Sequence, residues 1–313
     1  MAVRSQIQGW FQKCPMNEAI ISPQVETSRR ENDGLCVFGP RLVLIASLLF
    51  VFAIADCTAA FAQEPSAADE MRAGAVAYKF SDYAGAAEHF KAALAINPDL
   101  TQARLFLATA YAQQYIAGDE SEANVAMAQQ AIDQFKVVLN DDPSEQERYK
   151  SVVPIASLSF NLKRLDDARE YYGKAVALKP DEARNYFMLG LIDWTEASKS
   201  RAQEKSELGL TERQMISKPE ACASLRAQNQ QKVEDGIQRL QKALELQPDY
   251  DEAMGYMNLL FRERAEYECD DPEARKADLK AADEWTDKAM AATKARTDKS
   301  TAAEKPAPKQ PEN

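Results

Sequence analysis

Small and apolar residues recur at helical spacing in four stretches of the chain. In each stretch an Ala or Gly is followed four residues later by an aromatic residue or Leu, then three later by Ala or Val, and five later by Pro. The stretches are Ala86/Phe90/Ala93/Pro98, Ala131/Phe135/Val138/Pro143, Ala168/Tyr172/Ala175/Pro180 and Gly236/Leu240/Ala243/Pro248, and Ala282/Thr286/Ala289 repeats the spacing without the proline. Spacings of four and three place side chains on one stripe of a helix, and a proline after the last turn ends it. The pattern predicts a series of helices that are each buried along one face.

A second helical pattern lies upstream of each of these stretches. Its centre is a small or polar residue, and the centres are Gly74, Ala108, Ala156, Gly190 and Asn258. A glycine in mid-helix lowers helix propensity, but a small side chain lets a neighbouring helix approach closely. The chain is therefore predicted to be all-α, a solenoid of about five antiparallel helix pairs with one shared core.

The order of small, aromatic and proline positions is most complete in the first unit, which begins at Ala67. It holds Gly74, Tyr83, Ala86, Phe90, Ala93 and Pro98. In these positions the unit resembles the tetratricopeptide repeat, and the resemblance extends over residues 67–294. The large aromatic residue expected early in each first helix is missing from the first three units, where Glu70, Arg104 and Val152 stand. Pro154 falls inside an expected helix and predicts a kink there or a late start.

Three units are longer than the others between their two helices. The additions lie near residues 113–123, 196–229 and 265–277. Because such turns lie along one edge of a stacked array, the additions are expected to gather on one side. In the largest, the first helix is expected to run to about Glu207, followed by a loop and by an early start of the second helix. The alternative is a solvated spacer.

The N-terminal residues 1–62 have the features of an extension followed by a signal peptide. Residues 42–55 are almost entirely apolar and follow Arg41, and small residues precede Gln63. This run is short for a membrane span and has the length of a signal-peptide core, so cleavage after Ala62 is predicted. The mature protein would be periplasmic or secreted.

Alternatives stay open at both ends of the chain. An uncleaved segment 42–62 would anchor the protein in the inner membrane, and Cys57 would be a lipid attachment site were it not preceded by Asp56. Residues 1–36 carry no periodic pattern and are either a disordered extension or a misassigned start. The tail 295–313 holds three prolines and no large apolar residue, so we expect it to be disordered.

The chain carries 38 basic and 49 acidic residues, a net charge of -11. This balance argues against nucleic acid and anionic lipid surfaces and favours basic partners. His89 is the only histidine, with no second ligand at metal-binding spacing, and is interpreted as a surface residue. We expect no enzyme, no cofactor and no metal. An enzyme that uses only carboxylates and amides of the insertions is the weakest alternative.

Two cysteines, Cys222 and Cys269, remain after the predicted cleavage. An even count in an exported chain indicates a disulfide. Cys222 shortly precedes the second helix of one unit and Cys269 ends the first helix of the next, so both reach the same edge of a stacked array. The alternative is two free thiols.

Tetratricopeptide repeats generally present their first helices along a concave face, which implies a groove for an extended peptide. The residues placed there are Tyr78, Lys79, Gln113, Lys150, Phe160, Asn161, Arg184, Trp194 and Arg262. Aromatic residues flanked by Arg, Lys and amides suit recognition of an extended peptide. The alternative for Phe160 and Trp194 is packing against neighbouring units. The leading hypothesis is an exported scaffold of the bacterial cell envelope that binds protein or peptide partners, and the alternative is a membrane-anchored assembly platform.

Overall fold

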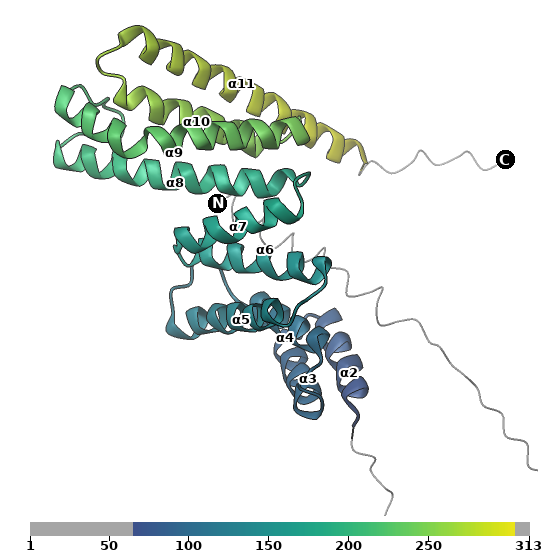
Figure 1. Ribbon diagram of the computed structural model, residues 1–313. Helices are drawn as coiled ribbons and strands as arrows, with labels where there is room; N and C mark the ends of the chain where they lie inside the picture. The colour runs from purple at the N-terminus through teal and green to yellow at the C-terminus, as the bar shows by residue number, and fades with distance from the viewer. Residues whose placement is uncertain (1–64, 304–313) are drawn as a thin grey trace, which may run out of the picture. The chain divides into compact units, whose positions relative to one another are not determined.

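The computed structural model describes residues 65–303 and, within that range, consists of ten helices joined by short turns (Figure 1). The predicted signal segment, its cleavage site and the last ten residues of the tail lie outside the described residues. None of the described helices is both long and apolar enough to span a bilayer. The coordinates divide into two compact units, one ending at Gln114 and one beginning at Tyr115.

The first unit contains the helices α2 (Ala67–Lys79), α3 (Tyr83–Ile96) and α4 (Thr101–Gln114). α2 and α3 form an antiparallel pair, and α4 packs against α3. The pair closes tightly at Gly74, where a Cβ atom would lie 2.6 Å from a ring carbon of Phe90. The ring of Phe90 then meets that of Phe106 on α4, with centroids 5.6 Å apart. The predicted role of a small residue at the centre of the first helix is confirmed here.

The second unit contains seven described helices. They are α5 (Glu122–Asn140), α6 (Glu145–Asn161), α7 (Leu165–Leu178), α8 (Ala183–Glu207), α9 (Pro219–Leu246), α10 (Asp251–Tyr267) and α11 (Pro272–Ala303). α6/α7, α8/α9 and α10/α11 form antiparallel pairs, α5 packs against α6, and α10 packs against both α8 and α9. The core between them includes Leu240, Met257 and Leu260, which are fully buried. The prediction of stacked antiparallel pairs is confirmed for these helices.

The long pair α8/α9 follows the sequence-based expectation closely. α8 ends at Glu207, a loop follows, and α9 begins at Pro219 in its first turn, where the missing N–H of proline leaves no bond unmade. Within the pair, a Cβ atom on Gly190 would lie 2.8 Å from the side chain of Leu240 and 3.2 Å from the carbonyl oxygen of Gly236. Glycine is therefore required at this crossing by the close approach of the second helix.

The insertion before α5 is a short loop with a defined closure. Ser121 caps α5, and Asn124 accepts a hydrogen bond from the Ile116 amide and donates to the carbonyls of Ile116 and Asp119. The two helices of the second predicted pair, α4 and α5, belong to different units. The expectation of a loop plus extra helical turns holds for α5 itself.

Two local expectations need correction. α6 begins at Glu145 and runs through Pro154, because Ser144 and Glu147 form a capping box that fixes its start, so a late start is wrong. α11 continues to Ala303, into the tail expected to be disordered. No proline interrupts it before Pro306, and the Arg296 guanidinium lies 2.7 Å from the Asp251 carboxylate of α10.

Glycine-to-alanine substitutions should separate close crossings from open helix surface. Gly190→Ala is expected to lower the unfolding free energy by about 1–3 kcal/mol, because the added methyl group overpacks the α8/α9 crossing. Gly173→Ala on α7 meets nothing within 4 Å and is expected to raise it by about 0.5–1 kcal/mol through helix propensity. Urea unfolding followed by circular dichroism measures both. A stabilised Gly190→Ala would show that the helices do not approach as described.

Candidate interaction surface

The residues predicted to line a peptide groove are divided between the two units. Tyr78, Lys79 and Gln113 belong to the first unit and the other six to the second, so the described geometry does not join them into one surface. The Tyr78 ring packs edge-on against Tyr83, with centroids 5.0 Å apart, whereas Lys79 is exposed and Gln113 is partly buried. In the first unit the groove assignment therefore stays a prediction that rests on Lys79 and Gln113.

In the second unit the predicted aromatic residues contribute to packing. Phe160 and Trp194 are partly buried against the core, and the Trp194 ring lies 5.2 Å from that of Tyr256 on α10, which sequence reasoning missed. Neither Trp194 Nε1 nor Asn161 Nδ2 finds a hydrogen-bond partner among the described residues, although both atoms are buried. The alternative that these rings pack against neighbouring helix pairs thus describes them well.

The remaining predicted residues differ in how available they are. Lys150 and Arg184 are partly buried. Arg262 is exposed, donates a hydrogen bond to Asn258 Oδ1 at 2.8 Å and lies 2.7 Å from the Asp283 carboxylate of α11. Its guanidinium ties α10 to α11, so a ligand would have to displace that pair.

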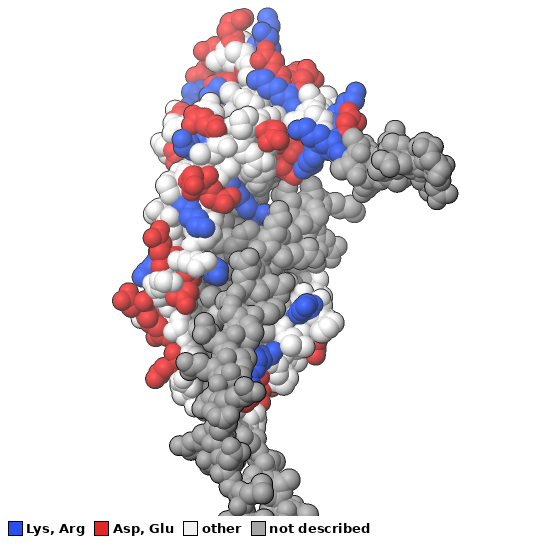
Figure 2. Space-filling view, turned by 90° about the vertical axis from the view of Figure 1, so that its right-hand side faces the viewer, with Lys and Arg blue, Asp and Glu red and all other residues white. Residues whose placement is uncertain are grey.

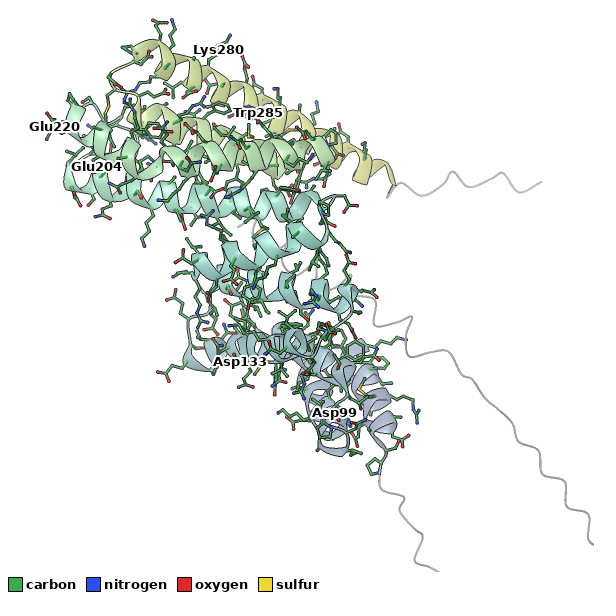
Figure 3. The ribbon with its side chains drawn as sticks, viewed as in Figure 1. Asp99, Asp133, Glu204, Glu220, Lys280 and Trp285 are labelled. Carbon is green, nitrogen blue, oxygen red and sulfur yellow. A yellow bond between two sulfur atoms is a disulfide. The ribbon has the colours of Figure 1, made fainter. Side chains whose placement is uncertain are left out.

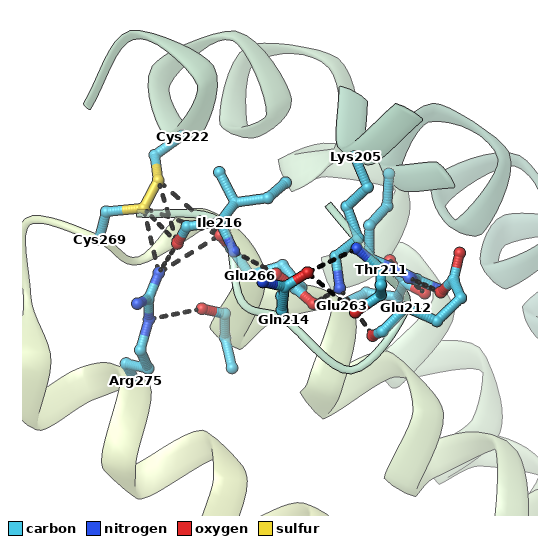
Figure 4. A network of polar contacts seen from close by, with 12 residues as sticks. Lys205, Thr211, Glu212, Gln214, Ile216, Cys222, Glu263, Glu266, Cys269 and Arg275 are labelled. Carbon is cyan, nitrogen blue, oxygen red and sulfur yellow. Dashed lines mark hydrogen bonds and ion pairs between the residues drawn. A yellow bond between two sulfur atoms is a disulfide. The ribbon is translucent and has the colours of Figure 1, made fainter. Parts of the chain in front are cut away.

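The loop between α8 and α9 is fixed to the turn between α10 and α11. We call the insertion edge the loop 208–218 together with Cys222, Cys269 and Arg275. Cys222 and Cys269 form a disulfide with Cα atoms 6.0 Å apart, the pairing expected from the sequence (Figure 4). Glu204 and Glu220 stand near the two helix ends that this loop joins (Figure 3).

Ile216 is the point where the loop is buried. Its side chain is fully buried, its amide donates to Glu266 Oε2 at 3.0 Å, and its carbonyl accepts from Arg275 Nη2 at 3.0 Å (Figure 4). Arg275 also donates to the carbonyl of Ala265, so one side chain joins the loop to the end of α10. A solvated spacer would make none of these contacts, so the insertion is a packed part of the second unit.

Buried ion pairs join α8 to α10 next to the insertion edge. Lys205 Nζ lies 2.5 Å from Glu266 Oε1, and both side chains are almost fully buried. Arg201 Nε lies 3.0 Å from both oxygens of Glu263, and its Nη1 reaches the exposed Glu212 of the loop at 2.6 Å. Two cations of α8 are therefore neutralised by two carboxylates of α10, as an interior of low polarity requires.

A third buried carboxylate belongs to Asp193 on α8. It is 1 % exposed, and it accepts hydrogen bonds from Arg169 of α7 and Arg239 of α9. Burial raises the pKa of the Asp193 carboxyl, and the two guanidinium groups oppose that rise. The arrangement links three helices through one carboxylate, so its role is structural.

The described residues contain no cluster of three or more His, Cys, Asp or Glu side chains that could hold a metal ion. His89 is partly exposed, with Nδ1 2.7 Å from Glu70 Oε2 on α2. At predicted helix starts, Asp271 caps α11 through the Ala274 amide, while Asp270 pairs with Arg226. The side chains of His89, Asp270 and Asp271 are thus used in a cap and in pairs with charged neighbours.

A cavity of about 640 Å³ lies between α5, α6 and α7, away from the insertion edge in sequence. Its walls combine the cationic side chains Lys136, Arg148 and Lys174 with the apolar Leu139, Tyr171 and Leu178. Sequence reasoning missed it, because its walls come mainly from second helices and the groove was placed on first helices. The only sequence signal was a set of lysines at exposed helix positions.

The additions near 196–229 and 265–277 meet at the Cys222–Cys269 disulfide, whereas the gathering of all three additions on one side stays a prediction, because the addition near 113–123 falls at the boundary between the two units. Residues 65–303 form an all-α array of tetratricopeptide-like helix pairs. No family model matches it, and no curated protein matches it.

Solved structures with similar helix arrangements include MamA and YrrB. The MamA crystal structure is 16% identical, with a TM-score of 0.48 over 74% of this chain and 94% of that one. MamA from Desulfovibrio magneticus RS-1 is 17% identical, with a TM-score of 0.48 over 73% and 96%. YrrB, described as a TPR protein with an unusual peptide-binding site, is 13% identical, with a TM-score of 0.47 over 79% and 97%.

Removing the disulfide should loosen the insertion edge. The bridge closes a loop with a sequence separation of 47, for which chain entropy gives about 4 kcal/mol as an upper figure. Cys222→Ser/Cys269→Ser is expected to lower the unfolding free energy by up to that amount and to speed tryptic cleavage after the exposed Arg213. Cleavage at an unchanged rate would mean that the ion pairs alone hold the loop.

The buried Glu263 should make stability depend on pH. Burial raises the pKa of this carboxyl to about 7, with Arg201 opposing the rise, whereas the unfolded value is about 4.3. The native state therefore binds more protons than the unfolded state between those values, so this contribution is complete below about pH 4 and is lost as pH rises through 7. On this account the second unit is less stable at about pH 8 than at about pH 5, by up to a few kcal/mol.

Urea unfolding at the two pH values measures this difference. Glu263→Gln cannot ionise and is expected to reduce it, whereas Glu284→Gln, at an exposed position of α11, serves as the control and leaves it unchanged. An equal pH dependence in wild type and Glu263→Gln would contradict the assignment.

Proposed function

We propose that the chain is an exported, non-enzymatic scaffold that binds protein or peptide partners and that the insertion edge is one of its binding surfaces. The observation that carries this proposal is that the 208–218 loop is held by its own contacts. Ile216 is buried and hydrogen-bonded to Glu266 and Arg275, and Glu212 pairs with Arg201. The Cys222–Cys269 disulfide joins the helix that follows the loop to the turn after α10. A loop that served only as a spacer would need none of these contacts.

A rigid loop suits binding because it is ordered before the partner arrives. Ordering flexible side chains and loops subtracts from affinity, so a surface that is already fixed keeps more of its contact energy. The loop side chains Thr211, Arg213, Gln214 and Lys218 are exposed around the buried Ile216. They offer hydrogen-bond donors and acceptors and two positive charges.

The distribution of charge on the described surface supports a scaffold that distinguishes its partners by their charges. Acidic and basic side chains are interspersed over the face seen in Figure 2, and neither sign forms a continuous field there. Charges at the rim of an interface mainly set specificity and association rate. With a net charge of -11 the chain as a whole favours basic partners.

Two features support export. The apolar residues 42–55 with Ala62 have the form of a signal peptide, and the Cys222–Cys269 disulfide is of a kind that forms in oxidising compartments. We therefore propose a periplasmic or secreted mature chain that begins at Gln63. A membrane-anchored assembly platform is the second candidate, favoured by the 42–62 segment if it is not cleaved. N-terminal sequencing of the mature protein separates the two.

Site-specific photocrosslinking in intact cells tests the scaffold function. A photoreactive phenylalanine analogue in place of Gln214, at the insertion edge, is expected to give a discrete adduct with a partner, whereas the same group at the exposed Gln241 of α9 gives none. Cys222→Ser/Cys269→Ser should reduce the yield at Gln214, because the loop is no longer held. A third position, Trp194, reports on the predicted groove. The proposal fails if none of these positions yields an adduct above that of Gln241.

A further inference from the structure

The cavity between α5, α6 and α7 differs in charge from the chain that contains it. Its walls carry Lys136 of α5, Arg148 of α6 and Lys174 of α7, and no acidic residue lines it. The chain as a whole has a net charge of -11. Three cations from three helices therefore line one cavity of an acidic protein. This local positive charge favours an anionic ligand.

These cations are available for a ligand. No ion pair of Lys136 is present among the described residues, and its side chain is exposed. The guanidinium of Arg148 lies 3.6 Å from the fully exposed Asp142, and Lys174 Nζ lies 2.6 Å from Glu170, which is also exposed. Exposed ion pairs of this kind contribute about 0–1 kcal/mol, so an incoming carboxylate can replace either acidic partner at small cost.

Apolar side chains line the cavity beside the cations. Val152 of α6, which is 2 % exposed, lines it together with Leu139 of α5 and Leu178 of α7. The Tyr171 ring, partly buried, lies 4.5 Å from Lys174 Nζ, so it offers an apolar face beside a cation. A volume of about 640 Å³ lies within the range of about 300–1,000 Å³ typical of ligand pockets and leaves room for one bulky side chain with its backbone.

We propose that this cavity docks an acidic peptide segment of a partner, with one bulky apolar side chain of that segment against Val152 and flanking carboxylates on Lys136, Arg148 and Lys174. This inference rests on the scaffold function proposed above and adds a second surface to it, on helices other than those of the insertion edge. It also gives the cavity a preference opposite to that of the whole chain, whose net charge favours basic partners.

Fluorescence anisotropy with the purified mature chain tests the docking. The probe is a labelled ten-residue peptide of Glu and Asp with a single central Phe. Two companion peptides carry Lys at every acidic position or Ser in place of Phe. The wild-type chain is expected to bind the probe at least tenfold more tightly than either companion, and the affinity should fall steeply as NaCl is raised from low to high concentration, because the contacts are ionic.

Two variants change the cavity in different ways. Lys136→Glu/Lys174→Glu reverses two of its charges, and Ala177→Trp fills it from an exposed position of α7. Each is expected to raise the Kd for the probe at least tenfold. The matched control is Lys276→Glu/Lys280→Glu on α11, which changes the net charge by the same amount. Each double variant also breaks one exposed ion pair between residues four apart, Lys280–Glu284 in the control and Lys174–Glu170 in the cavity. It should change the Kd less than twofold.

Three results would overturn the docking proposal. They are equal binding of the acidic and basic peptides, equal effects of the cavity and control variants, and a wild-type affinity for the probe weaker than millimolar. Circular dichroism shows whether each variant is folded, and Ala177→Trp keeps the test open if charge reversal disturbs α7. Photocrosslinking at Gln214 should be unaffected by the cavity variants. If the peptide does not bind but the Gln214 crosslink forms, the docking proposal fails and the scaffold function stands. If no crosslink forms at the tested positions, the scaffold function fails.

Discussion

The close crossing of α8 with α9 is the constraint on which the second unit depends. A Cβ atom on Gly190 would reach Leu240, and one on Gly236 would lie 2.9 Å from Leu260 and 3.1 Å from the Cβ atom of Asp193. Because α8 and α9 approach so closely at these glycines, Asp193 of α8 lies in the interface between the two helices and is buried. A buried carboxylate without partners would be very unfavourable, and Arg169 and Arg239 reach it from the two helices on either side. The tight crossing thus leads to the three-helix ion pair.

The same face of α8 continues from the core to the insertion edge. Asp193, Ala197, Arg201 and Lys205 follow one another at intervals of four residues, so they lie along one stripe of the helix. Asn229 of α9 donates to the Ala197 carbonyl at 2.9 Å, and the two cations beyond it meet carboxylates of α10. Buried ion pairs contribute little net stability, but breaking one is costly, so they are best suited to fixing how far α8 extends along α10. The loop that follows α8 is then delivered to the position where the disulfide can close.

Sequence periodicity predicted much of this fold, because helix faces, glycine crossings and proline ends are local features. The end of α8 near Glu207 and an early start of α9 were predicted from the repeat spacing. The meeting of Cys222 with Cys269 was predicted from the even number of cysteines and the expected stacking of the helix pairs. The burial of Lys205 and Glu266 could not be predicted, since an isolated charged residue in a polar insertion is normally solvated and only its distant partner makes burial tolerable.

The binding surfaces were harder to predict than the helices. An aromatic residue on the first helix of a pair gives the same sequence signal whether it lines a groove or packs against the next helix pair. Trp194 of α8 packs against Tyr256 of α10, in the next pair. The cavity of α5, α6 and α7 depends on three helices whose side chains converge only after packing. For such features the sequence supplies the residues but not their neighbours.

Net charge and local charge act on a partner at different distances. At physiological ionic strength the Debye length is about 8 Å, so the net charge of -11 acts mainly on an approaching partner and is weakened by salt. A carboxylate docked in the cavity would lie within that length of Lys136, Arg148 and Lys174, so these cations dominate its electrostatic energy.

An acidic segment therefore approaches slowly, because the protein repels it, and is retained once it is docked. A basic partner has the opposite behaviour, with fast approach and no stabilising contact in this cavity. Discrimination between partners on this face therefore lies in the dissociation rate, which is where related complexes usually differ.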